Sequence, residues 1–387
     1  MISLGRARLG NTSLGRVSAG EEGGAAVSFG LRQYVPCLRW KQGEYQALYR
    51  LSSKAQESIV PLIEIPEIGY DFESGMNSQS IDEHLSKFAK RAKDKWRGHC
   101  LVDMHLIESS QRMNNGRHPF GFVFDDIRLK GVLAIPVIDL KQDYYCQKEI
   151  KAIVTTDMRG LCIRVSIAEA AKPDLAASLG TLIQQYEVEA DECDFILDMG
   201  APNFEPIDSF GKLMETIIGK LPHLNEWRSF ALIGTSFPQS MGGLKLGESI
   251  IPRNEWKLYT SLIDRLTVSG TRIPTFGDYG INHPDVLLFD MRLAKPSATV
   301  RYTIKDGWLI LKGSNVRDHK FGQYRRLCQE VVASGYYCGI TFSEGDRYIH
   351  GCAQGTESTG TLTTWRWVGT NHHLEKVVQD VANLSVA

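Results

Sequence analysis

The segments GLCIRV at residues 160–165 and CDFILDM at residues 193–199 are short, mostly apolar runs that each have a charged residue at the next-to-last position. Between them lies LAASLGTLIQQYEV at residues 175–188, whose apolar residues recur every three or four positions. Two apolar runs joined by an amphipathic helix are typical of a βαβ unit, in which parallel strands are buried on both faces. This stretch therefore predicts a parallel sheet covered by helices.

The same alternation extends in both directions along the chain. Further strand candidates lie at residues 34–40, 59–65, 99–104, 131–140, 229–236 and 271–279. Eight strands within about 250 residues favour a TIM-type (β/α)₈ barrel. The alternative is an open doubly wound parallel sheet, which usually has five or six strands and a glycine-rich phosphate-binding turn after the first. No such turn follows the first candidate strand.

Three regions differ in their patterns. Residues 1–30 are rich in Gly, Ser and Arg and lack the apolar core of a signal peptide, so we expect a flexible N-terminal extension. Residues 31–295 hold the predicted barrel. Residues 296–387 are expected to form a C-terminal α+β extension packed on the barrel, because SATVRYTIKDGWLILKG at residues 297–313 alternates like a hairpin and a helical pattern follows at residues 321–334.

The composition is that of an ordinary soluble protein. The 387-residue chain is 43% hydrophobic and has a formal net charge of -1, which provides no overall attraction to nucleic acid. Its eight cysteines are scattered without a C-x-x-C pair, which favours a reducing cytoplasm and argues against a zinc ribbon. No apolar run approaches the roughly 18 residues of a membrane span, so no membrane partner is expected.

Polar residues follow nearly every strand candidate. They are Lys41, Glu44, Glu64, Asp103, Asp139, Arg164, Asp198, Thr235, Ser236, Asp278 and Tyr279. In a barrel the carboxyl ends of all strands meet at one rim, where barrel enzymes place their active sites. Each residue could instead cap a helix or serve as a buried counter-ion. So many charges at one rim favour a binding or catalytic role, because burying charge is costly.

Two chemistries suit such a rim. Glu64, Asp103, Asp139 and Asp198 could hold Mg²⁺ or Mn²⁺, and these acids together with Asp278 are candidate catalytic residues. Alternatively, Lys41, Arg164 and Arg301 could bind an anion such as a nucleotide, with acids orienting its hydroxyl groups. The candidate ligand-binding residues are Lys41, Glu44, Arg164, Ser236, Tyr279, Arg301, Arg366 and Asn371. Only His105 among the histidines lies close to a strand end, so a zinc site is not expected.

The segment near the end of the chain, residues 363–381 (the tail), is rich in functional groups. TTWRWVG at residues 363–369 alternates like a strand, and Thr370 or Asn371 is the expected N-cap of a last helix. His372 and His373 would then lie in its first turn, as candidate catalytic residues beside an anion bound by Arg366 and the helix N-terminus. The alternative is that the tail only fastens the last helix.

Three segments carry a resemblance to a known family. YVPCLRWKQGEYQAL near the start, VPLIEIPE after it, and RYIHGCAQGTESTGTLTTWRWVGTNHHLEKVV near the end resemble the bacterial and phage "beta protein" family, over roughly residues 34 to 383. The resemblance implies a barrel-related domain from bacterial genomes and mobile elements, with a role in phage–host conflict. It supplies no set of catalytic residues.

Three functions remain open. The first is an enzyme, such as a metal-dependent hydrolase or phosphodiesterase, acting on a phosphate-bearing small molecule or a nucleic-acid end. The second is a non-catalytic sensor that binds a ligand or a protein partner. The third is a nucleic-acid-binding module that uses the basic segment 306–326. The relevant residues of that segment are Lys312, Arg317, Lys320, Tyr324, Arg325 and Arg326.

Overall fold

The structure is a computed structural model that describes residues 28–285 and 295–384. Eight parallel strands form a closed barrel in the order β1-β11-β9-β8-β7-β6-β5-β2. In chain order they are β1 (Tyr34–Arg39), β2 (Leu62–Glu64), β5 (Cys100–Asp103), β6 (Ala134–Ile138), β7 (Leu161–Ser166), β8 (Cys193–Asp198), β9 (Ser229–Ile233) and β11 (Thr275–Asp278). Because β1 pairs with both β2 and β11, the sheet closes, which confirms the barrel and excludes the open sheet.

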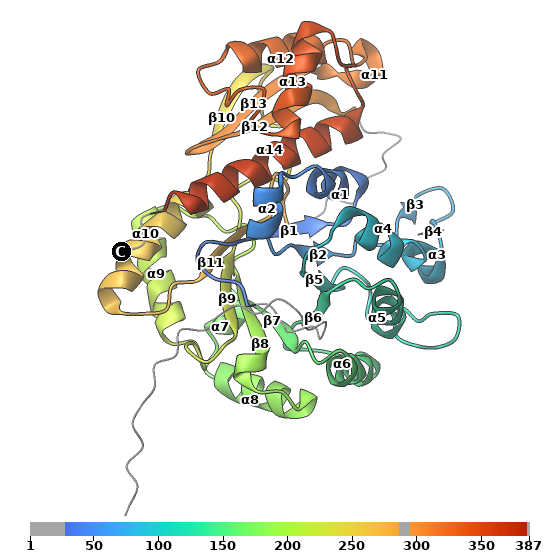
Figure 1. The fold of residues 1–387 in the computed structure, drawn as a ribbon, viewed down its shortest axis with the longest axis vertical. Coiled ribbons are helices and arrows are strands. Elements are labelled where there is room, and N and C mark those ends of the chain that lie inside the picture. Colours follow the sequence, from blue (N-terminus) through green and yellow to red (C-terminus); the bar gives the residue numbers. More distant parts are fainter. Residues whose placement is uncertain (1–27, 286–294, 385–387) are drawn as a thin grey trace, which may run out of the picture.

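Helices surround the barrel (Figure 1). They are α1 (Gln42–Tyr49), α2 (Ser53–Ser58), α3 (Ile81–Leu85), α4 (Phe88–Lys95), α5 (Pro119–Leu129), α6 (Tyr144–Asp157), α7 (Ile167–Ala170), α8 (Leu175–Tyr186), α9 (Ile207–Gly219) and α10 (Asn254–Ser269). A small hairpin of β3 (Tyr70–Asp71) and β4 (Met76–Asn77) follows β2. Strand-to-helix connections of this kind place the carboxyl ends of all eight strands at one rim.

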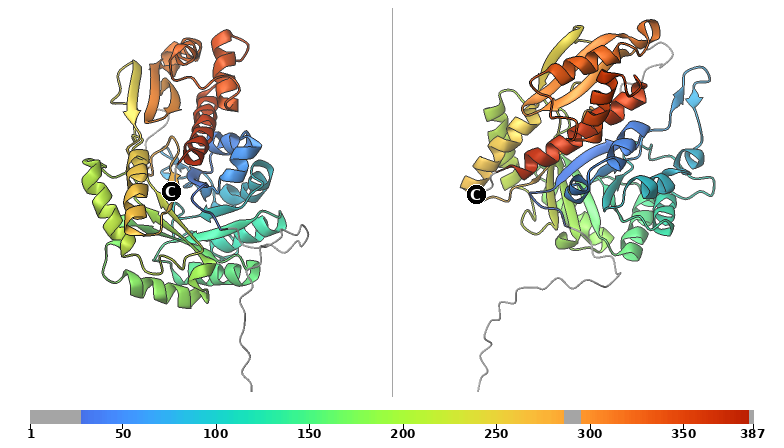
Figure 2. Two further views of the ribbon diagram at one scale, coloured as in Figure 1. Left: turned by 60° about the vertical axis from the view of Figure 1, so that its left-hand side comes forward. Right: turned by 45° about the horizontal axis from the view of Figure 1, so that its top comes forward.

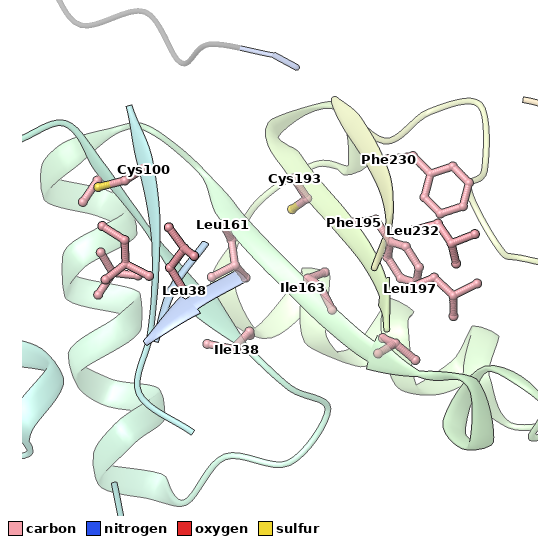
Figure 3. Packing of buried hydrophobic residues seen from close by; sticks show 14 of the residues in the cluster. Leu38, Cys100, Ile138, Leu161, Ile163, Cys193, Phe195, Leu197, Phe230 and Leu232 are labelled. Atoms are coloured by element: carbon pink, nitrogen blue, oxygen red, sulfur yellow. The ribbon is translucent and has the colours of Figure 1, made fainter. Parts of the chain in front are cut away.

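The alternation of side chains along each strand produces two apolar layers. Leu161 and Ile163 belong to the large core that also contains apolar residues of the surrounding helices, and Figure 3 shows them with other residues of that core, such as Leu38 and Phe195. Cys162, between them in β7, belongs to a separate cluster with Ile196 of the next strand. Successive residues of a strand point to opposite faces. The second cluster therefore fills the barrel interior and leaves the rim as the place for polar groups.

The predicted N-terminal extension lies mostly outside the described residues, which begin at residue 28. Phe29, near the end of that predicted segment, is buried, and its backbone N–H donates to Ser229 Oγ at 2.8 Å. Residues of the extension next to the barrel thus pack against it.

The C-terminal extension contains a three-stranded antiparallel sheet in the order β10-β13-β12. The predicted hairpin is confirmed as β12 (Ser297–Ile304) and β13 (Gly307–Asn315), which turn at Lys305 and Asp306. The third strand, β10 (Gly247–Pro252), comes from the segment between β9 and α10 and was not expected. Its six residues, GESIIP, contain only two large apolar side chains and end in proline, and its strand pairing is with the distant β13.

Four helices complete the extension: α11 (Val316–His319), α12 (Tyr324–Ala333), α13 (Glu344–Gln354) and α14 (Leu362–Ala382). Helix α14 lies between the extension and the barrel, as Figures 1 and 2 show, and it packs against α1 and β12. Among the described helices, none combines the length and the apolar character needed to cross a membrane.

The strand predicted for TTWRWVG is wrong, because these residues belong to the 21-residue helix α14. The N-cap is Thr361, whose hydroxyl accepts the Thr364 N–H, and not Thr370 or Asn371. The tryptophans that suggested strand alternation also fit a helix, since the buried Trp365 lies one turn from Val368 and two turns from His372. His372 and His373 therefore lie in the middle of a helix, so the anion site predicted at a helix N-terminus does not exist there.

Candidate functional site at the barrel rim

Arg164, at the end of β7, joins the carboxylates of three other strands. Its Nη1 donates to Glu64 Oε1 at 2.9 Å and to Asp103 Oδ2 at 2.7 Å, and its Nε donates to Asp198 Oδ2 at 2.8 Å. Its Nη2 donates to the Tyr279 hydroxyl at 2.7 Å, and that hydroxyl donates to Asp198 Oδ2 at 2.6 Å. The sequence prediction that these strand ends converge at one rim is thus met for five residues.

His105 lies two residues beyond the end of β5 and contacts the same cluster. Its Nδ1 is 3.1 Å from Asp103 Oδ1, and its Nε2 is 3.7 Å from Glu64 Oε1. Burial alone would lower the pKa of His105, but the Asp103 carboxylate raises it above its usual value. Burial would raise the pKa of Asp103, but His105 and Arg164 hold it well below its usual range. Asp103 is therefore ionised and His105 readily protonated.

The cluster opens into a cavity of about 1080 Å³, named the rim cavity, whose walls include Asp103, His105, Arg164, Asp198 and Tyr279. Its remaining walls come mainly from the segments after β5, β6, β7 and β8, with Glu67 after β2 and Pro284 and Asp285 after β11. Eight carboxylates line it, namely Glu67, Asp103, Glu108, Asp139, Asp143, Glu169, Asp198 and Asp285, against the permanent cations Lys141 and Arg164. Since Arg164 is already paired with carboxylates, the rim cavity carries an excess of negative charge.

The arrangement does not fit the predicted Mg²⁺ or Mn²⁺ site. The Arg164 guanidinium occupies the place among Glu64, Asp103 and Asp198 where an ion would have to bind. Asp139 points elsewhere: its Oδ1 accepts the Lys141 N–H at 2.7 Å and the Gln142 side-chain amide at 2.7 Å. Within residues 28–285 and 295–384, no group of three His, Cys, Asp or Glu residues is placed to hold a metal ion.

A comparison with protein families identifies the chain's relatives. The model of the family described as "Beta protein" matches residues 34–379, which is most of the chain. The chain belongs to the Beta protein family. No curated protein matches it in sequence. The match includes the barrel and nearly all of the C-terminal extension, so this Beta protein carries both parts within one family unit.

One solved structure with some similarity is described as "Native anSMEcpe with bound AdoMet and Cp18Cys peptide". It is 12% identical, the match covers 63% of each chain, and the TM-score is 0.30. That score is too low to establish a shared fold, so the similarity indicates nothing about the chemistry of this Beta protein family member.

A different cavity gathers four of the other predicted ligand-binding residues. This junction cavity, of about 830 Å³, lies between the barrel and the extension, and it is lined by Lys41, Glu44, Arg301 and Arg366 among others. Arg164 does not line it, and Arg301 does not line the rim cavity. The structure thus separates the three cations that the sequence suggested might bind one anion.

The remaining candidates have packing or pairing roles. Asp278 is fully buried, accepts from the Tyr34 hydroxyl, and lies 3.0 Å from His373 Nε2. His372 is equally buried, with its Nδ1 2.7 Å from Asp346. None of these groups lines either cavity.

Asn371 and Ser236 also have internal partners. The Asn371 side chain accepts the Gly345 N–H at 2.8 Å and donates to Ala47 O at 3.1 Å, which ties α13 to α1. The Ser236 hydroxyl donates to Glu255 at 2.6 Å and accepts the Asn254 N–H at 2.9 Å at the start of α10. Their contacts therefore fasten secondary-structure elements together.

His105 is the residue of the cluster that the sequence prediction left out of the candidate set. It had been weighed only as a zinc ligand. Its position two residues after Asp103 was an available signal, because residues two apart in an extended segment share a face.

Proposed function

We propose that this Beta protein is an enzyme that uses His105 at the barrel rim for general acid–base catalysis. The observation that supports this most directly is the contact between His105 and Asp103 at the wall of a large cavity. A histidine oriented by a carboxylate is a common proton-transfer group, and its efficiency is greatest when its pKa lies near the working pH.

The partners of Asp103 define its role. One carboxylate oxygen faces the His105 Nδ1 and the other accepts from Arg164. His105 Nδ1 lies 3.1 Å from Asp103 Oδ1 and 3.4 Å from Arg164 Nη1, and Nε2 lies 3.7 Å from Glu64 Oε1. In the tautomer with Nδ1–H facing Asp103, Nε2 is the nitrogen that takes up or releases the proton. Asp103 acts as the orienting residue, and Arg164 keeps it ionised by providing the compensating charge. Burial holds the pKa of the Tyr279 hydroxyl well above its usual value, so that group stays protonated beside Asp198.

The charge of the rim cavity restricts the substrate. A phosphate group would approach eight carboxylates, and the guanidinium that could attract it is already neutralised. A neutral or positively charged molecule with hydroxyl or amino groups is favoured instead, because carboxylates accept hydrogen bonds from such groups. The proposed role of His105 is to remove a proton from such a group, or return one to it, while a bond at that group is made or broken, so that the imidazole ends each turnover in its starting state. A phosphate-bearing ligand, as predicted from the sequence, fits the charges of the junction cavity better.

The histidine is tested by replacing it and searching for substrates. A metabolite extract is incubated with the wild type, with His105→Gln, and with His319→Gln as a control in which an exposed histidine of the extension is changed. Mass spectrometry is expected to show compounds consumed by the wild type and the control, and consumed at least about 100-fold more slowly by His105→Gln.

Equal consumption by His105→Gln and the wild type would contradict the proposal. A wild type that retains a compound through gel filtration without converting it would favour the non-catalytic sensor. In that case His105→Gln should alter retention and leave the composition of the extract unchanged.

The predicted role in phage–host conflict is open to a related experiment. Bacteria that express the wild type or His105→Gln are challenged with a panel of phages, and plaque formation is compared. If the rim chemistry serves this role, the wild type changes plaque numbers and His105→Gln restores the numbers seen with an empty vector.

A further inference from the structure

The junction cavity differs from the rim cavity in the sign of its charge. Its charged walls are six cations and two carboxylates. The cations are Arg39, Lys41, Lys295, Arg301, Lys312 and Arg366, and the carboxylates are Glu44 and Asp285. An excess of positive charge in a cavity attracts anions.

Two glycines, Gly43 and Gly369, leave the space that lets Arg366 and Arg301 reach the same cavity. A side chain at Gly43 in α1 would place its Cβ 2.1 Å from Arg366 Cγ, so the glycine makes room for this arginine. A Cβ at Gly369 in α14 would lie 3.0 Å from Arg301 O and 3.5 Å from Arg301 Cβ. The small residues thus allow α14 to lie directly on α1 and β12, which places two guanidinium groups near each other.

Arg39, Lys41 and Arg366 lie within 4.0 Å of the carboxylates Glu64, Glu67 and Glu44, respectively. Arg301 and Lys312 have no such carboxylate partner among the described residues. Arg301 Nε is buried and has no hydrogen-bond partner among the described residues. Lys312, which is also buried, donates its ammonium group to the backbone carbonyls of Met241 and Leu244, both at 2.7 Å. Burial and the neighbouring Arg366 charge lower the pKa of Arg301 to about 9. Buried cations of this kind are costly unless an anion neutralises them.

Glu44 provides a second, independent indication of a ligand. This residue is 4% exposed and lines the same cavity. Its Oε1 accepts from Asn282 Nδ2 at 3.3 Å and lies 4.0 Å from Arg366 Nε, but its Oε2 has no hydrogen-bond partner among the described residues. A buried carboxylate oxygen without a donor costs free energy, and a ligand hydroxyl could supply the missing donor.

We infer that the junction cavity binds a phosphate ester that also carries hydroxyl groups, such as a sugar phosphate or a nucleotide. The phosphate lies against Arg301 and Arg366, which neutralises their charges, and a hydroxyl donates to Glu44. The guanidinium groups suit this ligand because their N–H donors match the oxygens of a phosphate. The site is separate from the rim cavity, so binding does not depend on His105.

Calorimetry with defined probes tests the inference. Ribose 5-phosphate, inorganic phosphate and ribose are titrated into the full chain at constant ionic strength. Ribose 5-phosphate is expected to bind more tightly than the other two. Arg301→Met should weaken its binding at least about tenfold, because a charge-assisted hydrogen bond is lost. Glu44→Gln should reduce the advantage of ribose 5-phosphate over inorganic phosphate.

The controls separate this site from general charge effects. Arg326→Met removes an exposed arginine of the same extension and His105→Gln alters only the rim, so both should bind ribose 5-phosphate like the wild type. If Arg301→Met does not fold, Arg366→Met takes its place.

Two results would overturn the phosphate site: no binding of ribose 5-phosphate by the wild type at millimolar concentration, or unchanged binding by Arg301→Met or its substitute. Equal binding of ribose 5-phosphate and inorganic phosphate by the wild type would overturn the hydroxyl contact.

Discussion

The rim cavity and the junction cavity differ in whether their buried charged groups have partners. At the rim, the Arg164 guanidinium is shared by Glu64, Asp103 and Asp198, so every group of the cluster has a partner. At the junction, Arg301 Nε and Glu44 Oε2 are buried without hydrogen-bond partners among the described residues. The comparison shows that strand-end charges can stabilise one another before any ligand arrives. Charges assembled between two regions of a fold can instead be left for a ligand to complete.

The largest effect is expected from breaking the rim cluster. Arg164→Met leaves three carboxylates at the rim without their cation, which should cost about 3 to 5 kcal/mol of unfolding free energy. Urea denaturation measures the change. The control is Arg117→Met, in an exposed cluster with Asp125 and Glu149, where a loss of less than about 1 kcal/mol is expected. Similar losses in both variants would show that the rim cluster is not the tightly paired unit described.

The buried pair of His373 in α14 and Asp278 in β11 should make the free energy of unfolding depend on pH. His373 Nε2 lies 3.0 Å from Asp278, and Thr303 Oγ1 is 2.9 Å from His373 Nδ1. Burial lowers the pKa of His373 despite the nearby carboxylate. The unfolded chain therefore takes up a proton below about pH 6.5 that the folded chain resists, so stability falls with pH in that window.

His373→Gln is the variant that tests this pair. At pH 7.5 its free energy of unfolding should be about 2 to 3 kcal/mol below that of the wild type, because a hydrogen bond to a buried carboxylate is disturbed. The difference from the wild type should narrow as the pH falls from about 6.5 to 5, since the variant has no imidazole to protonate. Thermal denaturation across that range measures it, with His319→Gln expected to follow the wild type. A constant difference would refute the role of His373 titration.

The smallest effect concerns the packing that assembles the junction. Gly43→Ala forces Arg366 to move, and this overpacking should lower the free energy of unfolding by about 1 to 2 kcal/mol. It should also weaken binding of ribose 5-phosphate. Gly219→Ala is the matched control, because nothing lies within 4 Å of its Cβ position, and it should leave stability the same or slightly higher. Equal behaviour of the two variants would mean that the close approach of α14 is not needed.

The barrel was accessible from the sequence because its signal is local. Each of the eight barrel strands is a short apolar run. The segments that connect these runs have the periodicity of amphipathic helices. The convergence of Glu64, Asp103, Arg164 and Asp198 followed from the barrel alone. The role of Arg164 as the centre of the cluster did not follow, since the direction of a side chain depends on its neighbours in space.

The tail shows the opposite case. The residues from Thr363 to Gly369 alternate in a way that fits a strand or a helix, and the choice depended on Thr361 as the N-cap and on burial against α1 and β12. The strand β10 was missed for a similar reason, because its pairing with β13 involves residues about 60 positions apart. Long-range pairing of this kind leaves little trace in a local pattern.

The sequence by itself determined the barrel, the hairpin at Asp306 and the family, because periodicity, turn residues and segment matches are written in neighbouring positions. Only the tertiary structure decided which charges meet. It brought Arg164 to three carboxylates at the rim, and it placed Arg301 of the extension beside Arg366 of the last helix. The physical reason is that ion pairing depends on separations of a few ångströms between side chains from distant segments, which only the folded packing sets.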